Sequence, residues 1–434
     1  MSPVTIGILL IAVMLVLLFI GVPIGTGMAI SAFLGMILVI SPNAAVLKMA
    51  SSPFETMTSY TYAVMPLFML MAMLISTTGV GSDLYEFFYR TVGRLRGGLA
   101  MATVLACGIF AAISSSTSAT ALTIGLIALP EMRRNRYSDS LATGSVAAGG
   151  TLGILIPPSG IFIIYGIMTQ QSISKLFIAG IIPGIILIAL FCGSIALVCR
   201  RNQNAGPAGP KFSAKEVLQS LGKCIDVIIL LVIVMGGLFA SFFTPSEAAA
   251  VGCAGAILIT LIRKRLTWKN FKEAIHGTLK ASGIVYMIMI GAFILNYFMA
   301  LTNIPTALAN FIMSMGLSKT LVCVAIIIVY LILGCFLDAL AMILLTMPVF
   351  YPLIQAMNID PIWFGVIVTL SVGMACLTPP VGMNVYVIKG IAKHVPIDKI
   401  FGGAMPFLIC QVILVVLMFL IPGMATWLPS LIKG

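Results

Sequence analysis

The sequence predicts an all-α integral membrane fold made of two inverted repeats, each with a re-entrant helical hairpin and a broken helix. Its 434 residues are 61% hydrophobic and 8% charged, with a mean hydropathy of +1.17, whereas a soluble domain carries about 25% charged residues. The apolar runs are long and unbroken, as membrane helices require, and lack the alternation over about ten residues that marks a membrane barrel. Two motif pairs also recur in the two halves of the chain.

Apolar segments set the order of the elements. The first lacks a small-residue cleavage site before Gly21 and is predicted to be a membrane helix, with an uncleaved signal anchor as the alternative. Segments 97–129 and 319–351 are long enough to enter the membrane and return as hairpins, and 140–170 and 362–392 are broken by Pro-Pro pairs. The full series is 4–20, 24–41, 62–79, 97–129, 140–170, 177–199, 224–243, 247–262, 279–301, 319–351, 362–392 and 403–423.

Short amphipathic arms, 81–93 and 304–315, precede the two hairpins. A polar stretch containing NQNAGPAGPKFSAKE divides the chain near its midpoint. The predicted units are a first repeat over 1–200, a cytoplasmic linker over 201–223 and a second repeat over 224–434. Each repeat then holds scaffold helices, one arm, one hairpin and one broken helix.

The positions of lysine and arginine favour one topology. With the N-terminus outside and both hairpins returning to their own side, the inside connections hold 20 of the 24 basic residues. The exceptions are Lys48, Lys175, Lys319 and Lys433. Because cytoplasmic loops carry such an excess, both termini are predicted to be periplasmic. The first hairpin then enters from inside and the second from outside.

Two motif pairs carry the repeat. Matching Pro130 to Pro348 pairs Asp338 with Thr120, and the Pro-Pro motifs keep nearly the same spacing. Inverted repeats with broken helices are typical of secondary transporters, whose substrate and ion sites lie near the bilayer midplane. The pairs are SSSTSATALTIGLIALP (114–130) with LGCFLDALAMILLTMP (333–348), and GGTLGILIPPSG (149–160) with VGMACLTPPVG (372–382).

Broken membrane elements supply ligands for both cations and anions. A hairpin tip frees backbone carbonyls, which suit Na⁺, and Pro-Pro removes two donors from a helix. The N-terminus of a half-helix presents N–H groups and a positive dipole end, which suit a carboxylate. The first tip adds a hydroxyl cluster, for which bonding back to the i−4 carbonyl is the alternative role; its members are Ser114, Ser115, Ser116, Thr117, Ser118 and Thr120.

Asp338 is the one acidic residue deep inside an apolar run, and no lysine or arginine falls in a membrane core to pair with it. An ionisable group at such depth is costly and indicates function. Three roles stay open: a cation ligand or counter-charge, a proton carrier, and a carboxylate that caps backbone N–H groups of the hairpin. The last role is compatible with the first.

Composition excludes several other classes. The nine cysteines are scattered without a C-x-x-C pair, and His276 and His394 are isolated, so neither a disulfide framework nor a metal site beyond Na⁺ is expected. The net charge of +12 follows from basic cytoplasmic loops and does not call for nucleic acid. An intramembrane hydrolase built on the serine cluster or Ser159 would lack a membrane-embedded base, so the chain is predicted not to be an enzyme.

Over its full length the chain resembles the large membrane subunit of tripartite ATP-independent periplasmic (TRAP) transporters, the DctM-like permeases. The resemblance implies a bacterial inner-membrane secondary transporter that works by an elevator mechanism and couples to Na⁺. It implies organic-acid substrates such as C4-dicarboxylates, sialic acids, keto acids and sulfonates. The motifs that carry it are VPIGTGMAIS (22–31), GGLAMATVLACGIFAAISSSTSATALTIGLIALPEM (97–132), AAGGTLGILIPPSGIFIIYG (147–166), TPSEAAAVG (244–252) and ACLTPPVGMNVYVIKG (375–390).

The resemblance also implies partners and sites. The partners would be a separate small four-helix membrane subunit (DctQ-like), a periplasmic substrate-binding protein (DctP-like) and the lipid bilayer. By position, Na⁺ would be bound by Ser114, Ser116, Gly150, Pro157, Gly334, Asp338, Thr378 and Met383. Because no arginine lies in a membrane segment, half-helix N-termini, hydroxyls and amides are expected to bind the substrate, at Ser115, Thr117, Ser118, Thr120, Ser159, Pro379 and Asn384, with Asn296 as an alternative amide.

One departure concerns the hydroxyl run at 114–118, where members of this family often have a glycine. It leaves open whether a serine there would bind an ion through its hydroxyl or its carbonyl. Proton coupling through Asp338 and an anion channel on the same scaffold remain the alternatives to a Na⁺ symporter.

Overall fold

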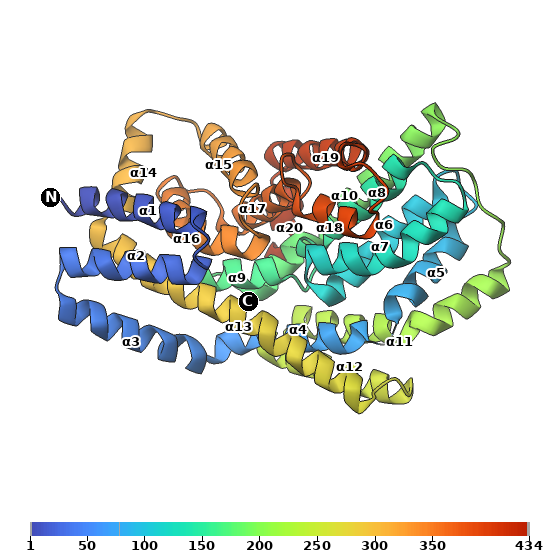
Figure 1. Cartoon of the computed structure of the whole chain (residues 1–434), viewed down its shortest axis with the longest axis horizontal. Helices are drawn as coiled ribbons and strands as arrows, with labels where there is room; N and C mark the ends of the chain where they lie inside the picture. Colours follow the sequence, from blue (N-terminus) through green and yellow to red (C-terminus); the bar gives the residue numbers. More distant parts are fainter. Residues whose placement is uncertain (1, 78, 432–434) are drawn as a thin grey trace.

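The computed structural model describes residues 2–77 and 79–431, and every regular element in these ranges is helical. The all-α prediction is therefore confirmed (Figure 1). The first half holds α1 (Pro3–Phe19), α2 (Ile24–Val39), α3 (Pro42–Thr58), η1 (Tyr60–Ala63), α4 (Val64–Ser76), α5 (Val80–Val92), α6 (Gly98–Ser114), α7 (Thr117–Arg134), α8 (Asp139–Thr151), η2 (Leu152–Ile154), α9 (Gly160–Thr169) and α10 (Ile173–Arg201).

The second half repeats this helix order, with α13 unbroken over 35 residues where the first half has the pair α3 and α4, bent by 58°, and with α20 added at its end. Helix α3 was not expected. The second half holds α11 (Ala214–Phe239), α12 (Pro245–Ile262), α13 (Trp268–Thr302), α14 (Ile304–Ser314), α15 (Lys319–Leu333), α16 (Ala339–Ala356), α17 (Pro361–Ala375), α18 (Met383–Ile391), α19 (Ile397–Leu420) and α20 (Gly423–Ser430).

Among the described residues, six helices are long and apolar enough to cross a membrane, and the bent pair α3 and α4 would make a seventh span. Those six are α10, α11, α12, α13, α16 and α19, and shorter apolar helices accompany them. Lys433, one of the exceptions in the charge count, lies outside the described residues. Many exposed leucine, isoleucine and valine side chains on α10 to α13 and α19 suit contact with lipid.

The two hairpins and two broken helices lie at corresponding places in the halves. Helices α6 to α9 begin at residues 98, 117, 139 and 160, and α15 to α18 begin at 319, 339, 361 and 383, so partners lie 221 to 223 residues apart. In Figure 1 the elements α5 to α7 lie toward one end of the molecule and α14 to α16 toward the other, as an inverted repeat requires. The breaks also correspond, since both Pro157–Pro158 and Pro379–Pro380 are cis peptide bonds.

The central linker is shorter than predicted and is bound to the first half. Helix α10 extends to Arg201 and α11 begins at Ala214, so the non-helical part of the predicted 201–223 linker covers 202–213. The remaining non-helical stretch pairs with the base of the first hairpin through the N–H of Gly97 and the carbonyl of Gly206, 2.9 Å apart. Tyr137 adds a hydrogen bond from its hydroxyl to the carbonyl of Pro207, at 3.0 Å.

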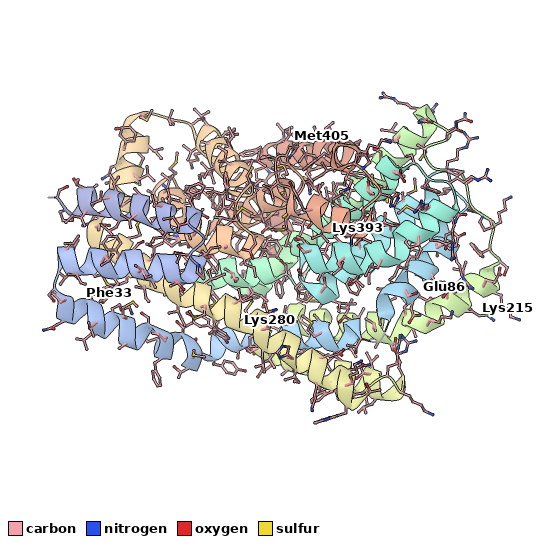
Figure 2. The ribbon with its side chains drawn as sticks, in the orientation of Figure 1. Phe33, Glu86, Lys215, Lys280, Lys393 and Met405 are labelled. Atoms are coloured by element: carbon pink, nitrogen blue, oxygen red, sulfur yellow. The ribbon has the colours of Figure 1, made fainter. Side chains whose placement is uncertain are left out.

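An ionic network fixes the arm α5 to the second half. The guanidinium of Arg263, which follows α12, lies 2.7 Å from the carboxylate of Asp83 on α5 and 2.6 Å from that of Asp226 on α11. Glu86 on α5 also pairs with Lys223 at 2.8 Å, at the end of the molecule where Figure 2 labels Glu86 and Lys215. The other arm, α14, contains no charged residue and is held by α1, α13 and α16. The two arms therefore differ in how firmly they are anchored.

Helices α8 and α19 pack backbone to backbone through glycines. A Cβ atom on Gly403 would lie 1.9 Å from the carbonyl oxygen of Ser140, and one on Gly144 would lie 2.1 Å from the carbonyl oxygen of Gly403. Neither helix can accept a side chain at this crossing without separating. The neighbouring Gly402 faces open space.

This adjacency gives a matched pair of variants. We expect Gly403→Ala to lower the unfolding temperature of the purified protein markedly, because backbone must move to admit the methyl group. Gly402→Ala should be neutral or stabilising by about 0.5–1 kcal/mol, since alanine replaces glycine in an unobstructed helix. Thermal unfolding of both variants in detergent checks this, and equal stabilities would contradict the packing described.

Candidate functional site

The first hairpin tip is a turn of three serines. Helix α6 ends at Ser114, Ser115 adopts a left-handed backbone with φ of 51°, and Ser116 begins α7 as its N-cap. The Ser116 hydroxyl accepts from the N–H of Ala119 at 3.4 Å, and the Ser114 hydroxyl lies 2.6 Å from that of Thr120. Ser115 donates to the carbonyl of Pro158 at 2.7 Å. The tip is thus tied directly to the break between α8 and α9.

The second hairpin tip ends on a carboxylate. Residues 334–338 form the turn between α15 and α16, and Asp338 is the N-cap of α16. Its Oδ1 accepts a hydrogen bond from the N–H of Ala341 at 2.9 Å. The predicted capping role is therefore confirmed. The side chain remains exposed, and one wall of a cavity includes it.

Cap geometry corrects the predicted register of the repeat. Asp338 and Ser116 are both N-caps of the second hairpin helix, and they lie as far apart as Pro157 and Pro379. Asp338 therefore corresponds to Ser116 and not to Thr120. The predicted register was wrong because the alignment matched Pro130 with Pro348. These prolines lie 218 residues apart, whereas the caps lie 222 residues apart.

Both tips and both breaks line one cavity of about 320 Å³. The first tip contributes Ser114 to Ala119, the second contributes Asp338 to Leu340, and the breaks contribute Gly160, Cys376 and Met383 among others. The opposite wall is apolar and comes from α4 and α13, including Phe68, Met69 and Val285. Asp338 is the one ionisable carboxylate, and no lysine, arginine or histidine is among the described residues that line the cavity.

The predicted site residues divide into those that line this cavity and those behind it. The lining set is Ser114, Ser115, Ser116, Thr117, Ser118, Asp338 and Met383. Thr120 is fully buried and bonded to Ser114, Gly150 and Gly334 are buried against neighbouring helices, and Pro157 lines a separate apolar cavity. Thr378 donates to the carbonyl of Met374 at 2.7 Å, and Pro379 is exposed in the second break. Asn296 lies elsewhere, in a groove between α3 and α13.

Two side chains predicted to bind the substrate instead hold the broken helices. Asn384 is fully buried and donates to the carbonyl of Ala147 at 3.0 Å, which links α18 to α8. Ser159 is also fully buried, donates to the carbonyl of Ile154 and caps α9. Neither side chain lines the cavity in this structure, and each instead supports a broken helix.

Comparison with known proteins assigns the chain to a family. The family model described as "Tripartite ATP-independent periplasmic transporter, DctM component" matches residues 11–424. The chain belongs to the DctM family. A C4-dicarboxylate TRAP transporter large permease from Pseudomonas aeruginosa is 34% identical over 91% of this chain and 92% of its own length. A sialic acid TRAP transporter large permease from Vibrio cholerae is 30% identical over 96% of this chain and 97% of its own.

A solved structure shares the fold of this DctM-family chain. The YdaH transporter of Alcanivorax borkumensis superposes with a TM-score of 0.62, covering 88% of this chain and 89% of its own at 14% identity. At that identity the likeness concerns the fold alone. The DctM-family chain is thus a multi-pass membrane permease and not an enzyme, as predicted.

The sequence reasoning missed one supporting residue of this DctM-family chain. Gln411, fully buried on α19, donates from Nε2 to the hydroxyl of Thr151 at 2.9 Å, next to the first break. Its amide oxygen and that of Asn384 have no hydrogen-bond partner in the described part of the chain. The available signal was a lone amide in the otherwise apolar segment 403–423. Together Gln411 and Asn384 fix the end of α8 from two sides.

Proposed function

We propose that this chain is the membrane permease subunit of a binding-protein-dependent secondary transporter that imports an organic acid by Na⁺ symport. The observation that carries the proposal is the single cavity into which both hairpin tips and both broken helices project. Such a cavity offers freed backbone N–H groups for an anion and freed carbonyl groups for a cation within one small volume. The alternatives are H⁺ coupling or an anion channel on the same scaffold.

The first tip is suited to the anion. The N–H groups of the first turn of α7, at Thr117 and Ser118, have no intrahelical acceptor, and the positive end of the helix dipole lies there. The cap, Ser116, is neutral, so it leaves that potential uncancelled. Ser115 and Ser118 add hydroxyls. Without an arginine in the cavity, these groups are the strongest anion ligands it offers.

The second tip is suited to the cation. The carboxylate of Asp338 cancels the positive end of α16 and leaves oxygen lone pairs directed at the cavity. Oxygen ligands of this kind suit Na⁺. In this quasi-symmetric site the anion would bind at the hydroxyl groups of the first tip, and Na⁺ would bind at the carboxylate of the second tip. Their mutual attraction across a low-dielectric cavity would couple the two binding events.

The size of the cavity favours a compact substrate. Small-molecule sites occupy about 300–1,000 Å³, and this cavity, at about 320 Å³, lies at the lower end. A C4-dicarboxylate or a small keto acid or sulfonate suits it better than a sialic acid. Relatives of the chain are named for both C4-dicarboxylate and sialic acid transport.

An elevator mechanism fits the composition of the cavity walls. The ligand-facing wall belongs to the two hairpins and broken helices, while the apolar wall belongs to α4 and α13. An apolar wall can slide past the other without breaking hydrogen bonds. The hairpins and broken helices would carry the ligands, and the arms α5 and α14 would connect them to the scaffold. The family further suggests a small four-helix membrane subunit, a periplasmic binding protein and the bacterial inner membrane. The distribution of lysine and arginine supports periplasmic termini.

Uptake into proteoliposomes tests this function. The chain is reconstituted with its small membrane subunit, a loaded binding protein is placed outside, and uptake of succinate and of N-acetylneuraminate is measured under Na⁺ or pH gradients. We expect succinate uptake that requires an inward Na⁺ gradient. Uptake driven by a pH gradient and indifferent to Na⁺ would establish the H⁺ alternative, and passive flux without any gradient would establish a channel.

A further inference from the structure

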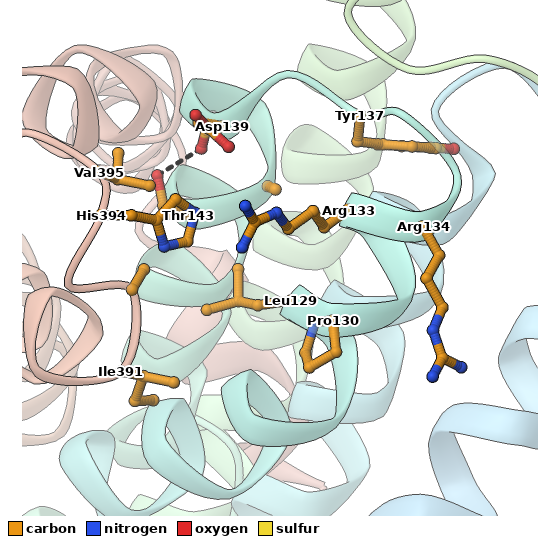
Figure 3. Close-up of a pocket in the computed structure, with 12 residues that line it drawn as sticks. Leu129, Pro130, Arg133, Arg134, Tyr137, Asp139, Thr143, Ile391, His394 and Val395 are labelled. Atoms are coloured by element: carbon orange, nitrogen blue, oxygen red, sulfur yellow. Dashed lines mark hydrogen bonds between the residues drawn. The ribbon is translucent and has the colours of Figure 1, made fainter.

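A second cavity, of about 510 Å³, lies at the base of the first hairpin, away from the tips (Figure 3). Its walls come from the end of α7, the start of α8 and the segment that follows α18. No residue of either hairpin tip, of α4 or of α13 is among the described residues that line it. The cavity is therefore separate from the transport site and belongs wholly to the unit that carries the hairpins and broken helices.

Basic groups face into this cavity. Figure 3 shows the guanidinium of Arg133 directed toward the imidazole of His394, while the side chain of Arg134 points away. Arg134 lies 3.9 Å from Glu131, whereas Arg133 has no ion pair in the described part of the chain. Asp139 is the one carboxylate in the lining and does not pair with Arg133. The cavity thus holds an unneutralised guanidinium.

The walls are fixed by hydrogen bonds and by packing. Lys389 donates to the carbonyls of Lys393 and Val395, at 2.8 and 2.7 Å, and so holds the loop that bears His394. Thr143 donates to the backbone carbonyl of Asp139 at 2.6 Å, as drawn in Figure 3. Leu129, Pro130, Ala142, Ile391 and Ala392 make the remaining wall apolar. Arg133 and His394 are both exposed, so an anion can reach them from the solvent.

We propose that this cavity binds an oxyanion, a phosphate or carboxylate group, between Arg133 and His394. A guanidinium presents paired donors that match two oxygens of such a group, and an imidazole supplies one more donor. The bound group would join α7 to the loop after α18 and so brace the first hairpin against the second broken helix. The topology predicted from charge places the cavity on the cytoplasmic side. Its two available sources there are an anionic phospholipid headgroup and a soluble anion.

Two binding measurements on the full chain distinguish these sources. The unfolding temperature in detergent is titrated with inorganic phosphate, which reports a soluble oxyanion and is not the substrate expected in the cavity between the tips. Native mass spectrometry after exposure to phosphatidylglycerol micelles reports retained lipid. The variants are Arg133→Gln and, as the matched control, Arg134→Gln, which removes the same charge from the same helix end. Arg134 also lines the cavity, but its guanidinium points away from Arg133 and His394 (Figure 3) and lies 3.9 Å from Glu131. His394→Gln tests the second ligand.

We expect wild type to bind in at least one arm, Arg133→Gln to weaken that binding about tenfold or more, and Arg134→Gln to change it less than twofold. His394→Gln should weaken it less than Arg133→Gln does. Equal weakening by Arg133→Gln and Arg134→Gln would show a diffuse surface charge effect and would overturn the proposal. Absence of binding to wild type in both arms would overturn it as well.

Discussion

Replacing Asp338 with Asn is expected to reduce Na⁺-driven uptake by about 10- to 100-fold while the protein stays folded. Asparagine caps a helix about as well as aspartate, so the bond from the N–H of Ala341, 2.9 Å long in wild type, should persist. The variant therefore removes the charge and little else. Losing a charged oxygen ligand in a low-dielectric cavity costs about 1.5–3 kcal/mol, which is of the order of 10- to 100-fold.

Asp360→Asn is the matched control for that variant. Asp360 caps α17 in the same way, accepting from the N–H of Trp363 at 2.8 Å, but it does not line the cavity between the tips. Uptake should remain near wild type in Asp360→Asn, and both variants should keep their unfolding temperature within a few degrees. Normal uptake by Asp338→Asn would show that Asp338 acts only as the cap of α16 and does not bind the ion.

Replacing Ser116 with Asp should strongly weaken substrate binding without unfolding the hairpin. Aspartate is a good N-cap, so α7 should form as before. Its carboxylate would, however, cancel the positive end of α7 and repel the substrate anion from the N–H groups of Thr117 and Ser118. We expect the KM for uptake to rise by about 100-fold or more, because like charges in a low-dielectric site repel strongly.

Two further variants separate charge from capping at this position. Ser116→Asn keeps the cap without the charge, so its KM should stay within several-fold of wild type. Ser318→Asp introduces the same carboxylate at the N-cap of α15, where Ser318 accepts from the N–H of Leu321 at 3.3 Å away from the cavity, and should leave uptake unchanged. Unaltered KM in Ser116→Asp would place the substrate anion elsewhere.

Much of the architecture follows from periodicity and charge. Hairpins, breaks and arms could be predicted because long Gly- and Pro-interrupted apolar runs have few other solutions in a membrane. Helix α3 could not, because its sequence, PNAAVLKMASSPFETMT, mixes lysine, glutamate and proline into an apolar face and resembles a loop. Its helical state depends on packing against α2 and α13, which a local pattern does not report.

The site was predictable at the level of segments more than of side chains. The sequence placed polar residues at the tips, and most of the serine cluster does line the cavity. Side-chain direction depends on the crossing of helices distant in sequence. Asn384 therefore turned out to hold α8, and Gln411 was overlooked. The pairing of Asp338 with Ser116 could be recognised only from the positions of the two N-caps in the structure. Pro130 and Pro348 lie at different distances from these caps, so aligning the prolines gave the wrong register.

Substrate protection of a single cysteine tests most directly whether the cavity between the tips is the transport site. Ser118→Cys is introduced into a variant whose nine native cysteines are replaced with alanine, because Cys376 lines the same cavity and Cys335 lies in the turn of the second tip. Labelling by a maleimide is followed with and without succinate and Na⁺ in the reconstituted complex. We predict that the label abolishes uptake and that succinate with Na⁺ together slow labelling more than either alone. Labelling at an unchanged rate, with full uptake by the labelled protein, would contradict the account.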